Sequence, residues 1–112
     1  MTVIILEDDP AVCDAIATFV KQMGYPICTY HDAESFFAAP VPGGEDMVIV
    51  DIGLPGIDGT RVIDWLNALA DPPRVLAITG QSQTAIREFL EGMPRVDLLR
   101  KPLSANELAI YF

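Results

Sequence analysis

Short aliphatic runs that alternate with helical segments set the strongest constraint on the fold of this chain. The runs cover residues 2–6, 25–30, 46–50, 74–79 and 96–99. Several are almost continuous in Val, Ile and Leu, without the polar alternation of a strand that has one face in water. Such runs are typical of strands that are covered on both faces, as in a parallel sheet.

Apolar residues recur at helical spacing in the segments between these runs. The predicted helices cover residues 10–24, 33–39, 59–70, 82–92 and 103–112. Ser104 and Glu107 form a capping-box pattern at the start of the last helix, which is short. The alternating order predicts one α/β domain with a doubly wound sheet and right-handed crossovers.

Composition narrows the class of protein. The chain has 112 residues, of which 51% are hydrophobic, and a formal net charge of −9. That charge disfavours binding to nucleic acid or to anionic membranes. No apolar run approaches the ~18 residues that span a bilayer, and the N-terminus lacks a signal-peptide pattern, so we expect a soluble, cytoplasmic protein. Cys13 and Cys28 are expected to be free thiols in a reducing compartment.

Polar residues follow four of the five predicted strands at the point where each strand ends. They are Glu7, Asp8 and Asp9 after the first strand, Asp51 after the third, Thr79 at the end of the fourth and Lys101 after the fifth. In open α/β sheets, ligands bind beyond the carboxyl ends of the strands. We therefore expect these side chains to meet at one edge of the sheet.

Ordinary structural roles account for some of these residues. Asp9 before Pro10 is predicted to be the N-cap of the next helix rather than a metal ligand. Thr79 taken alone would be a strand threonine, and Lys101 a solvated lysine. Asp51 is the hardest to explain in this way, because it follows a buried run and a carboxylate is costly to desolvate.

The remaining acids point to a cation and to phosphoryl chemistry. Glu7, Asp8 and Asp51 held together would repel one another unless a cation joined them. Carboxylates and waters suit Mg²⁺, and a carboxylate beside Mg²⁺ can attack a phosphoryl group to form an aspartyl phosphate. Such a transfer needs positive charge and donors around the phosphoryl oxygens, and Lys101 and Thr79 are residues of the required types.

Four motifs together resemble the receiver domain of bacterial two-component response regulators. They are Glu7-Asp8, "DIGLPGIDG" at 51–59, "TG" at 79–80 and "KP" at 101–102. Each motif is weak alone, but their order and intervals match the family over essentially the whole chain. The resemblance implies a flavodoxin-like, chemotaxis-regulator-like fold with strand order 2-1-3-4-5. It also implies a single receiver domain over residues 1–112, with no output domain in this chain.

The resemblance assigns a role to each residue of the acidic group. Asp51 is expected to be the phosphoacceptor. Glu7 and Asp8 are expected to hold Mg²⁺ with Asp51 and the backbone carbonyl of Gly53, with Asp8 the more direct ligand of the first two. The resemblance therefore implies Mg²⁺ as the cofactor.

Residues at the ends of the last two strands take the other family roles. Thr79 is expected to follow the phosphoryl group, Lys101 to pair with it, and the peptide bond before Pro102 to be cis. Gly59 is expected to let its helix begin tightly against the sheet. Leu98 occupies the possible switch position, three residues before the lysine, where the family often has Tyr or Phe, and leucine has no ring or hydroxyl group to present to a partner.

Two further segments depart from the family or bear on its switching. Pro94 stands where the family tends to have small residues, and the helix over 82–92 is expected to end by about Gly92. The loop over 80–84 is expected to change on phosphorylation, together with the face formed by the helix over 82–92, the strand over 96–99 and the last helix. Gly53 and Gln81 flank the expected attack path, so their side-chain sizes bear on the lifetime of the acyl phosphate.

The expected partner is a histidine kinase or a histidine phosphotransfer protein, with readout through a downstream protein or an output domain. The resemblance allows a weak homodimer through the last helix, which its short length disfavours. The chain is expected to catalyse only its own phosphorylation and dephosphorylation. His31, the single histidine, is expected to be a surface or strand-end residue rather than a phosphohistidine.

Two other functions remain open from the sequence. A Mg²⁺-dependent phosphohydrolase could use Asp51 as its nucleophile, but such hydrolases commonly need a second acid where this chain has Gly53. A constitutive interaction module would keep the fold without being phosphorylated. The complete set of acids, threonine and lysine disfavours that alternative.

Overall fold

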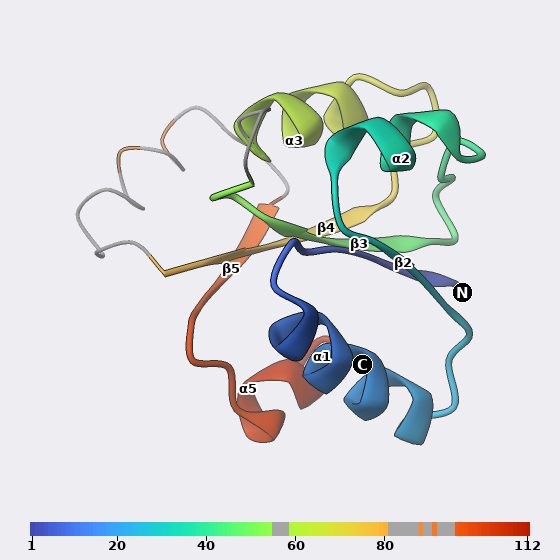
Figure 1. The fold of residues 1–112 in the computed structure, drawn as a ribbon. Coiled ribbons are helices and arrows are strands. Elements are labelled where there is room, and N and C mark those ends of the chain that lie inside the picture. The colour runs from blue at the N-terminus through green and yellow to red at the C-terminus, as the bar shows by residue number, and fades with distance from the viewer. Residues whose placement is uncertain (55–58, 81–87, 89–90, 92–95) are drawn as a thin grey trace.

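Five parallel strands form the centre of the molecule. The computed structural model describes residues 1–54, 59–80, 88, 91 and 96–112. The strands are β1 (Val3–Leu6), β2 (Ile27–Tyr30), β3 (Met47–Asp51), β4 (Arg74–Thr79) and β5 (Val96–Arg100). Their order in the sheet is β2-β1-β3-β4-β5, and every neighbouring pair is parallel (Figure 1). The predicted fold and strand order are confirmed.

Helices cover both faces of the sheet. The described helices are α1 (Pro10–Gln22), α2 (Ala33–Ala38), α3 (Gly59–Asn67) and α5 (Ala105–Ala109). Figure 1 shows α2 and α3 on one face and α1 and α5 on the other. None of the helices in the described ranges is long and apolar enough to cross a membrane.

Side chains of the central strands alternate between two apolar layers. On β1, Ile4 and Leu6 pack toward α2 and α3, whereas Val3 and Ile5 pack toward α1 and α5. All four are at least nine-tenths buried. Fully burying an aliphatic side chain of this size contributes about 1.5–3 kcal/mol, so the two layers fix the sheet between its helices.

The edge strands differ from the expectation of burial on both faces. β1 and β3 are buried at every residue, and β4 at every residue after Arg74. In β2, Cys28 and Thr29 are exposed, and β5 is fully buried only at Leu99. The prediction of burial on both faces is confirmed for the three central strands. The edge strands are more exposed because each has a neighbouring strand on one side only.

Some helix boundaries differ from the predicted ones. The helix predicted over 59–70 ends at Asn67, and the last helix is confined to Ala105–Ala109, with Ser104 as its N-cap as predicted. After it, the ring of Phe112 packs against Phe19 and Tyr25. Apart from residues 88 and 91, the predicted helix over 82–92 lies outside the described residues, as do Pro94, Gln81 and most of the loop over 80–84.

Gly59 begins α3 at a point of close backbone contact with the end of β3. Its amide donates to the carbonyl oxygen of Ile52 at 3.2 Å. A Cβ atom at this position would lie 2.6 Å from the Cα of Ile52 and 2.7 Å from the carbonyl oxygen of Asp51. Both neighbours are backbone atoms that cannot rotate away, so only glycine allows this approach.

We predict that Gly59→Ala lowers the free energy of unfolding by about 1–3 kcal/mol, since overpacking outweighs the better helix propensity of alanine. Urea denaturation checks this value. Gly53→Ala is the matched control, because a Cβ there would meet only the Asp51 Oδ1, at 3.6 Å. Equal stability of Gly59→Ala and the wild type would contradict the prediction.

Candidate carboxylate and cation site

Two acids, Glu7 and Asp51, lie side by side where β1 and β3 end. Leu6 is in register with Val50, so Glu7 and Asp51 occupy adjacent positions at the carboxyl edge of the sheet. Glu7 is completely buried and Asp51 is 4% exposed, whereas Asp8 is exposed. One oxygen from each of the three carboxylates lies within 4.8 Å of the others. The structure thus brings together the three acids singled out in the sequence.

Lys101 reaches this pair from the segment that follows β5. Its Nζ lies 3.0 Å from Glu7 Oε1 and 3.1 Å from Asp51 Oδ2, and its side chain is 24% exposed. The backbone amide of Lys101 donates to the carbonyl oxygen of Thr79 at 2.7 Å. The peptide bond between Lys101 and Pro102 is cis. One ammonium group therefore holds two acids that come from different strands.

The two buried carboxyl groups have pKa values displaced in opposite directions. Burial raises the pKa of Glu7 to about 7, and the nearby Asp51 charge adds to the effect, although Lys101 partly offsets it. Burial also raises the pKa of Asp51, but hydrogen bonds from Gly53 and Lys101 help to bring it below its ordinary value. The pKa of Lys101 is raised, because its two acidic partners outweigh its own burial. Asp51 is therefore the ionised member of the pair at neutral pH.

One side-chain oxygen of Glu7 has no hydrogen-bond partner among the described residues. Its Oε1 accepts from Lys101 and from the Asp9 amide at 3.2 Å, whereas its Oε2 is buried and unpaired among the described residues. An unpaired buried carboxylate oxygen costs free energy unless something binds it. Oxygen donors from three clustered acids fit Mg²⁺, a hard cation that prefers carboxylates and water.

The loop after β3 holds the other oxygen of Asp51. The Gly53 amide donates to Asp51 Oδ1 at 2.9 Å, and Gly53 itself is exposed. Asp9 acts as the N-cap of α1, because its Oδ1 accepts from the Ala11 amide at 2.9 Å and the Val12 amide at 3.4 Å. The prediction that Asp9 is a cap is therefore confirmed.

Thr79 lies at the same edge of the sheet, whereas Leu98 lies in the middle of β5. Thr79 is the last residue of β4 and is 1% exposed. Leu98 pairs with Ala77 on the adjacent strand and packs partly buried against the layer beneath α2 and α3. Leu98 is the position at which the family often has Tyr or Phe, and its aliphatic side chain is part of this packing.

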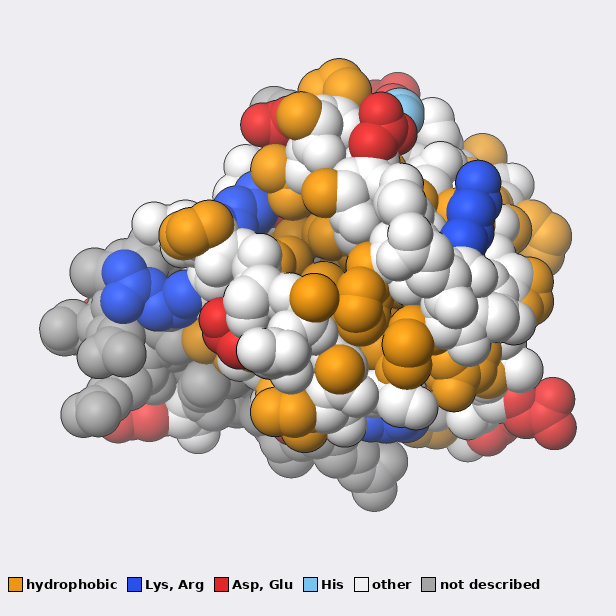
Figure 2. All heavy atoms as spheres, turned by 90° about the horizontal axis from the view of Figure 1, so that it is seen from below, with side chains coloured by type: hydrophobic (Ala, Val, Ile, Leu, Met, Phe, Trp, Pro, Cys, Tyr) orange, Lys and Arg blue, Asp and Glu red, His pale blue; other side chains and the backbone are white. Residues whose placement is uncertain are grey.

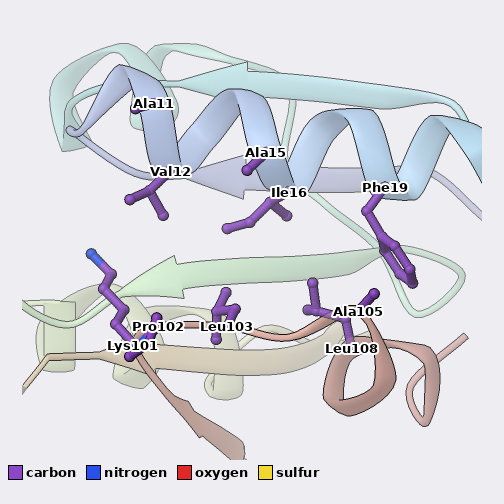
Figure 3. A pocket seen from close by; sticks show the side chains of 10 residues that line it. All are labelled: Ala11, Val12, Ala15, Ile16, Phe19, Lys101, Pro102, Leu103, Ala105 and Leu108. Carbon is purple, nitrogen blue, oxygen red and sulfur yellow. The ribbon is translucent and has the colours of Figure 1, made fainter.

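An apolar groove opens beside the site, between α1 and the segment from Lys101 to α5. Figure 2 shows the side of the molecule covered by α1 and α5, with hydrophobic side chains gathered in its hollowed centre. The groove has a volume of about 640 Å³, and its walls include Val12, Ile16 and Leu103 (Figure 3). Lys101 lines one end while its ammonium points toward the end of β3.

His31 is a member of this site that the sequence argument did not place there. It follows β2, and its Nδ1 lies 3.0 Å from the carbonyl oxygen of Glu7. The signal in the sequence was its position directly after a predicted strand, at the same edge as the acids. That signal is weak for a single residue, and it was interpreted as an ordinary strand-end histidine.

Comparison with known proteins assigns the family. The profile of the response regulator receiver domain matches residues 3–111. The chain belongs to this family. Two relatives are the sensory transduction protein RegX3 of Mycolicibacterium smegmatis, 31% identical over 107 residues, and the transcriptional regulatory protein FixJ of Bradyrhizobium diazoefficiens, 27% identical over 105 residues. These matches cover 96% and 93% of this chain but 46% and 51% of the relatives, so the chain spans about half their length.

Solved structures agree with the fold of this receiver domain. The response regulator DrrB of Thermotoga maritima superposes with a TM-score of 0.84 at 17% identity, over 97% of this chain and 49% of that one. The signal receiver domain of a LuxO repressor protein from Vibrio parahaemolyticus gives a TM-score of 0.75 at 27% identity, over 98% and 85%. The likeness to DrrB bears on the fold alone.

We predict that the metal-free receiver domain loses stability as pH rises from about 5 to 8. The pKa of Glu7 is raised from 4.5 to about 7, so the folded state binds this proton more tightly than the unfolded chain. The resulting stabilisation is complete below about pH 4.5 and is lost as pH rises through about 7, with a size on the order of 1–3 kcal/mol. The lowered pKa of Asp51 acts with the opposite sign and only at lower pH.

Urea denaturation of wild type and Glu7→Gln at about pH 5 and about pH 8, with chelator present, measures this loss of stability. Glutamine keeps an acceptor for Lys101 but cannot ionise, so we expect its stability to be flat over this range and to exceed that of the wild type at pH 8. Glu34→Gln, at an exposed residue of α2, is the matched control. Parallel pH profiles for wild type and Glu7→Gln would contradict the assignment to Glu7.

Proposed function

We propose that this receiver domain is a phosphoacceptor of a two-component phosphorelay, taking a phosphoryl group onto Asp51 and changing a protein-contact surface. The observation that carries this proposal is the Asp51 carboxylate itself. It is buried and ionised, it is held by the Gly53 amide on Oδ1 and by the Lys101 ammonium on Oδ2, and it lies beside two further acids. A fixed carboxylate with cationic surroundings suits nucleophilic attack on phosphorus.

The donor is proposed to be the phosphohistidine of a histidine kinase or of a histidine phosphotransfer protein. An Asp51 oxygen forms a bond to phosphorus while the phosphorus–nitrogen bond breaks, and the electron pair stays on the imidazole nitrogen, which takes up a proton. The lowered pKa of Asp51 keeps the nucleophile ionised at neutral pH. Lys101, now bound to Glu7 and Asp51, is close enough to pair with the phosphoryl oxygens as charge develops on them.

Mg²⁺ is proposed as the cofactor. Glu7, Asp8, Asp51 and the Gly53 carbonyl would hold it, and it would neutralise negative charge on the phosphoryl oxygens. Glu7 suits this role because its buried Oε2 has no protein partner among the described residues. Asp8 suits it because its carboxylate is exposed to solvent and has an oxygen within 4.8 Å of those of the other two acids.

The proposed chemistry is limited to the domain's own phosphorylation and dephosphorylation. A phosphohydrolase acting on a separate substrate would place a general acid two residues after the nucleophile, where this chain has Gly53. We place the domain in the cytoplasm, where its donor would act, with readout by contact with a downstream protein or an output domain. A weak homodimer is compatible with this readout.

Thr79 is proposed to pass the change at Asp51 to the rest of the domain. It is buried at the end of β4, and its carbonyl accepts from the Lys101 amide, so the two phosphoryl-binding residues share a hydrogen bond. The responding surface is proposed to include the segment from residue 80 to Lys101. Within it, Leu98 is the proposed switch position and would respond by changing rotamer rather than by exposing an aromatic ring.

We predict that beryllofluoride, in the presence of Mg²⁺, forms an adduct with wild type, and that acetyl phosphate labels Asp51. Asp51→Asn removes the nucleophile and abolishes both. Amide NMR and mass spectrometry of the labelled peptide are the measurements. Asp14→Asn, at an exposed residue of α1, is the matched control and is expected to label like wild type. A folded, Mg²⁺-binding wild type that never labels would contradict the proposal and favour a constitutive interaction module.

We also predict that Thr79→Ala still accepts beryllofluoride but no longer transmits the change. Amide shifts should then stay near Asp51 and Gly53, whereas in wild type they reach Leu98 and Lys101. The reason is that alanine lacks the hydroxyl group proposed to follow the phosphoryl group. Thr18→Ala, at an exposed residue of α1, serves as the matched control. Shifts that spread equally in Thr79→Ala would exclude Thr79 as the transmitting residue.

A further inference from the structure

His31 donates a hydrogen bond to the backbone of Glu7, the first of the three acids that follow β1. Its Nδ1 lies 3.0 Å from the Glu7 carbonyl oxygen. A carbonyl oxygen can only accept a hydrogen bond, so the proton of this bond is on Nδ1. The imidazole therefore carries a proton on Nδ1, and this nitrogen is the donor of the hydrogen bond.

This bond takes over where the backbone ladder between β1 and β2 ends. The ladder pairs Leu6 with Tyr30, and the Glu7 amide still donates to the Tyr30 carbonyl at 3.0 Å. A parallel ladder would next supply a backbone donor from residue 32 to the Glu7 carbonyl. Instead Asp32 turns the chain into α2 as its N-cap, and the imidazole of His31 supplies the donor.

The acceptor belongs to the peptide unit from which Asp8 projects. The Glu7 carbonyl and the Asp8 amide form one planar group, so a bond to the carbonyl fixes the plane in which the chain leaves β1. Glu7 is held on its side chain as well, by Lys101 and by the Asp9 amide. Together with the His31 bond, these contacts hold both the main chain and the side chain of Glu7. They thereby set the directions of the Glu7 Oε2, which is unpaired among the described residues, and of the Asp8 carboxylate.

We infer that His31 is a positioning residue for cation binding by this site: its Nδ1–H group orients the Glu7–Asp8 peptide so that both carboxylates face one ion. The inference rests on the proposed function, because it gives a role within the proposed Mg²⁺ site. It does not make His31 a ligand. The cluster of carboxylate oxygens within 4.8 Å of one another consists of Glu7, Asp8 and Asp51 among the described residues.

Substitutions that differ in where they place a donor test this inference. Asparagine carries its amide nitrogen close to the place of Nδ1, whereas glutamine carries it farther out, and alanine has none. We expect His31→Ala and His31→Gln to weaken Mg²⁺ binding by about 3–10-fold, the effect of losing one hydrogen bond, with His31→Asn within about 2-fold of wild type. Titration with Mg²⁺ alone, followed by the amide shifts of Asp8 and Gly53, measures the affinities.

Two controls separate positioning from general loss of structure. Thr29→Ala alters an exposed residue of the same edge strand and should leave the Mg²⁺ affinity unchanged. Urea denaturation shows whether each variant is folded under the titration conditions. Rescue by asparagine is the decisive result, since a general weakening of β2 would affect the asparagine and alanine variants alike. Equal Mg²⁺ affinities in wild type and His31→Ala would overturn the inference, as would equal weakening in all three His31 variants.

The imidazole tautomer gives a readout that does not require Mg²⁺. Nitrogen-15 NMR of the metal-free domain is expected to show a protonated Nδ1 on His31, and this signature should persist in Asp51→Asn. A neutral ring protonated on Nε2 would overturn the positioning role even if Mg²⁺ binds as proposed. A wild type with protonated Nδ1 but no affinity for Mg²⁺ would overturn the proposed function and, with it, the role of His31 in cation binding.

Discussion

The ion pairs from Lys101 to Glu7 and Asp51 are the interaction on which the functional edge depends. A single ammonium, about one-quarter exposed, balances two acids that are almost completely buried. Without Lys101 the buried Asp51 charge would lose its cationic partner, and losing such a partner costs about 3–5 kcal/mol. Above the pKa of Glu7, one ammonium faces two charged carboxylates, and the exposed Asp8 adds to the excess negative charge. This arrangement is the physical basis of the proposed Mg²⁺ site.

Stability and function make opposite demands on Glu7. Burial raises its pKa to about 7, and its Oε2 has no partner among the described residues, so the side chain is unfavourable for folding at neutral pH. A neutral residue of the same shape would be accommodated more easily at this position. Asp51 differs because the Gly53 amide and Lys101 stabilise its charge. The environment thus displaces the pKa values of two neighbouring carboxyl groups in opposite directions, which supports the different roles proposed for them.

The sequence was most informative where the fold leaves little choice. The aliphatic runs of β1, β3 and β4 predicted strands that are buried on both faces. The rule that ligands bind beyond strand ends predicted that Glu7, Asp51 and Lys101 lie close together. The exposure of β2 was not predictable from its residues, because it depends on having a neighbour on one side only. The opposite pKa displacements of Glu7 and Asp51 arise from contacts between separate strands, and the contact of His31 depends on where a ladder ends. The spacing of residues along the chain predicts neither the pKa displacements nor the His31 contact.

Backbone hydrogen bonds continue one residue beyond the strands and place the site residues. The Glu7 amide donates to the Tyr30 carbonyl, the Ile52 amide to the Ile78 carbonyl, and the Lys101 amide to the Thr79 carbonyl. The side chains at this edge can therefore be polar while their main chains stay fixed by the sheet. The bond between Lys101 and Thr79 has a further consequence, because Lys101 also borders the groove beside α1. Under the proposed function, a displacement of Thr79 that moves its backbone would therefore act on Lys101, at the end of the groove, through this hydrogen bond.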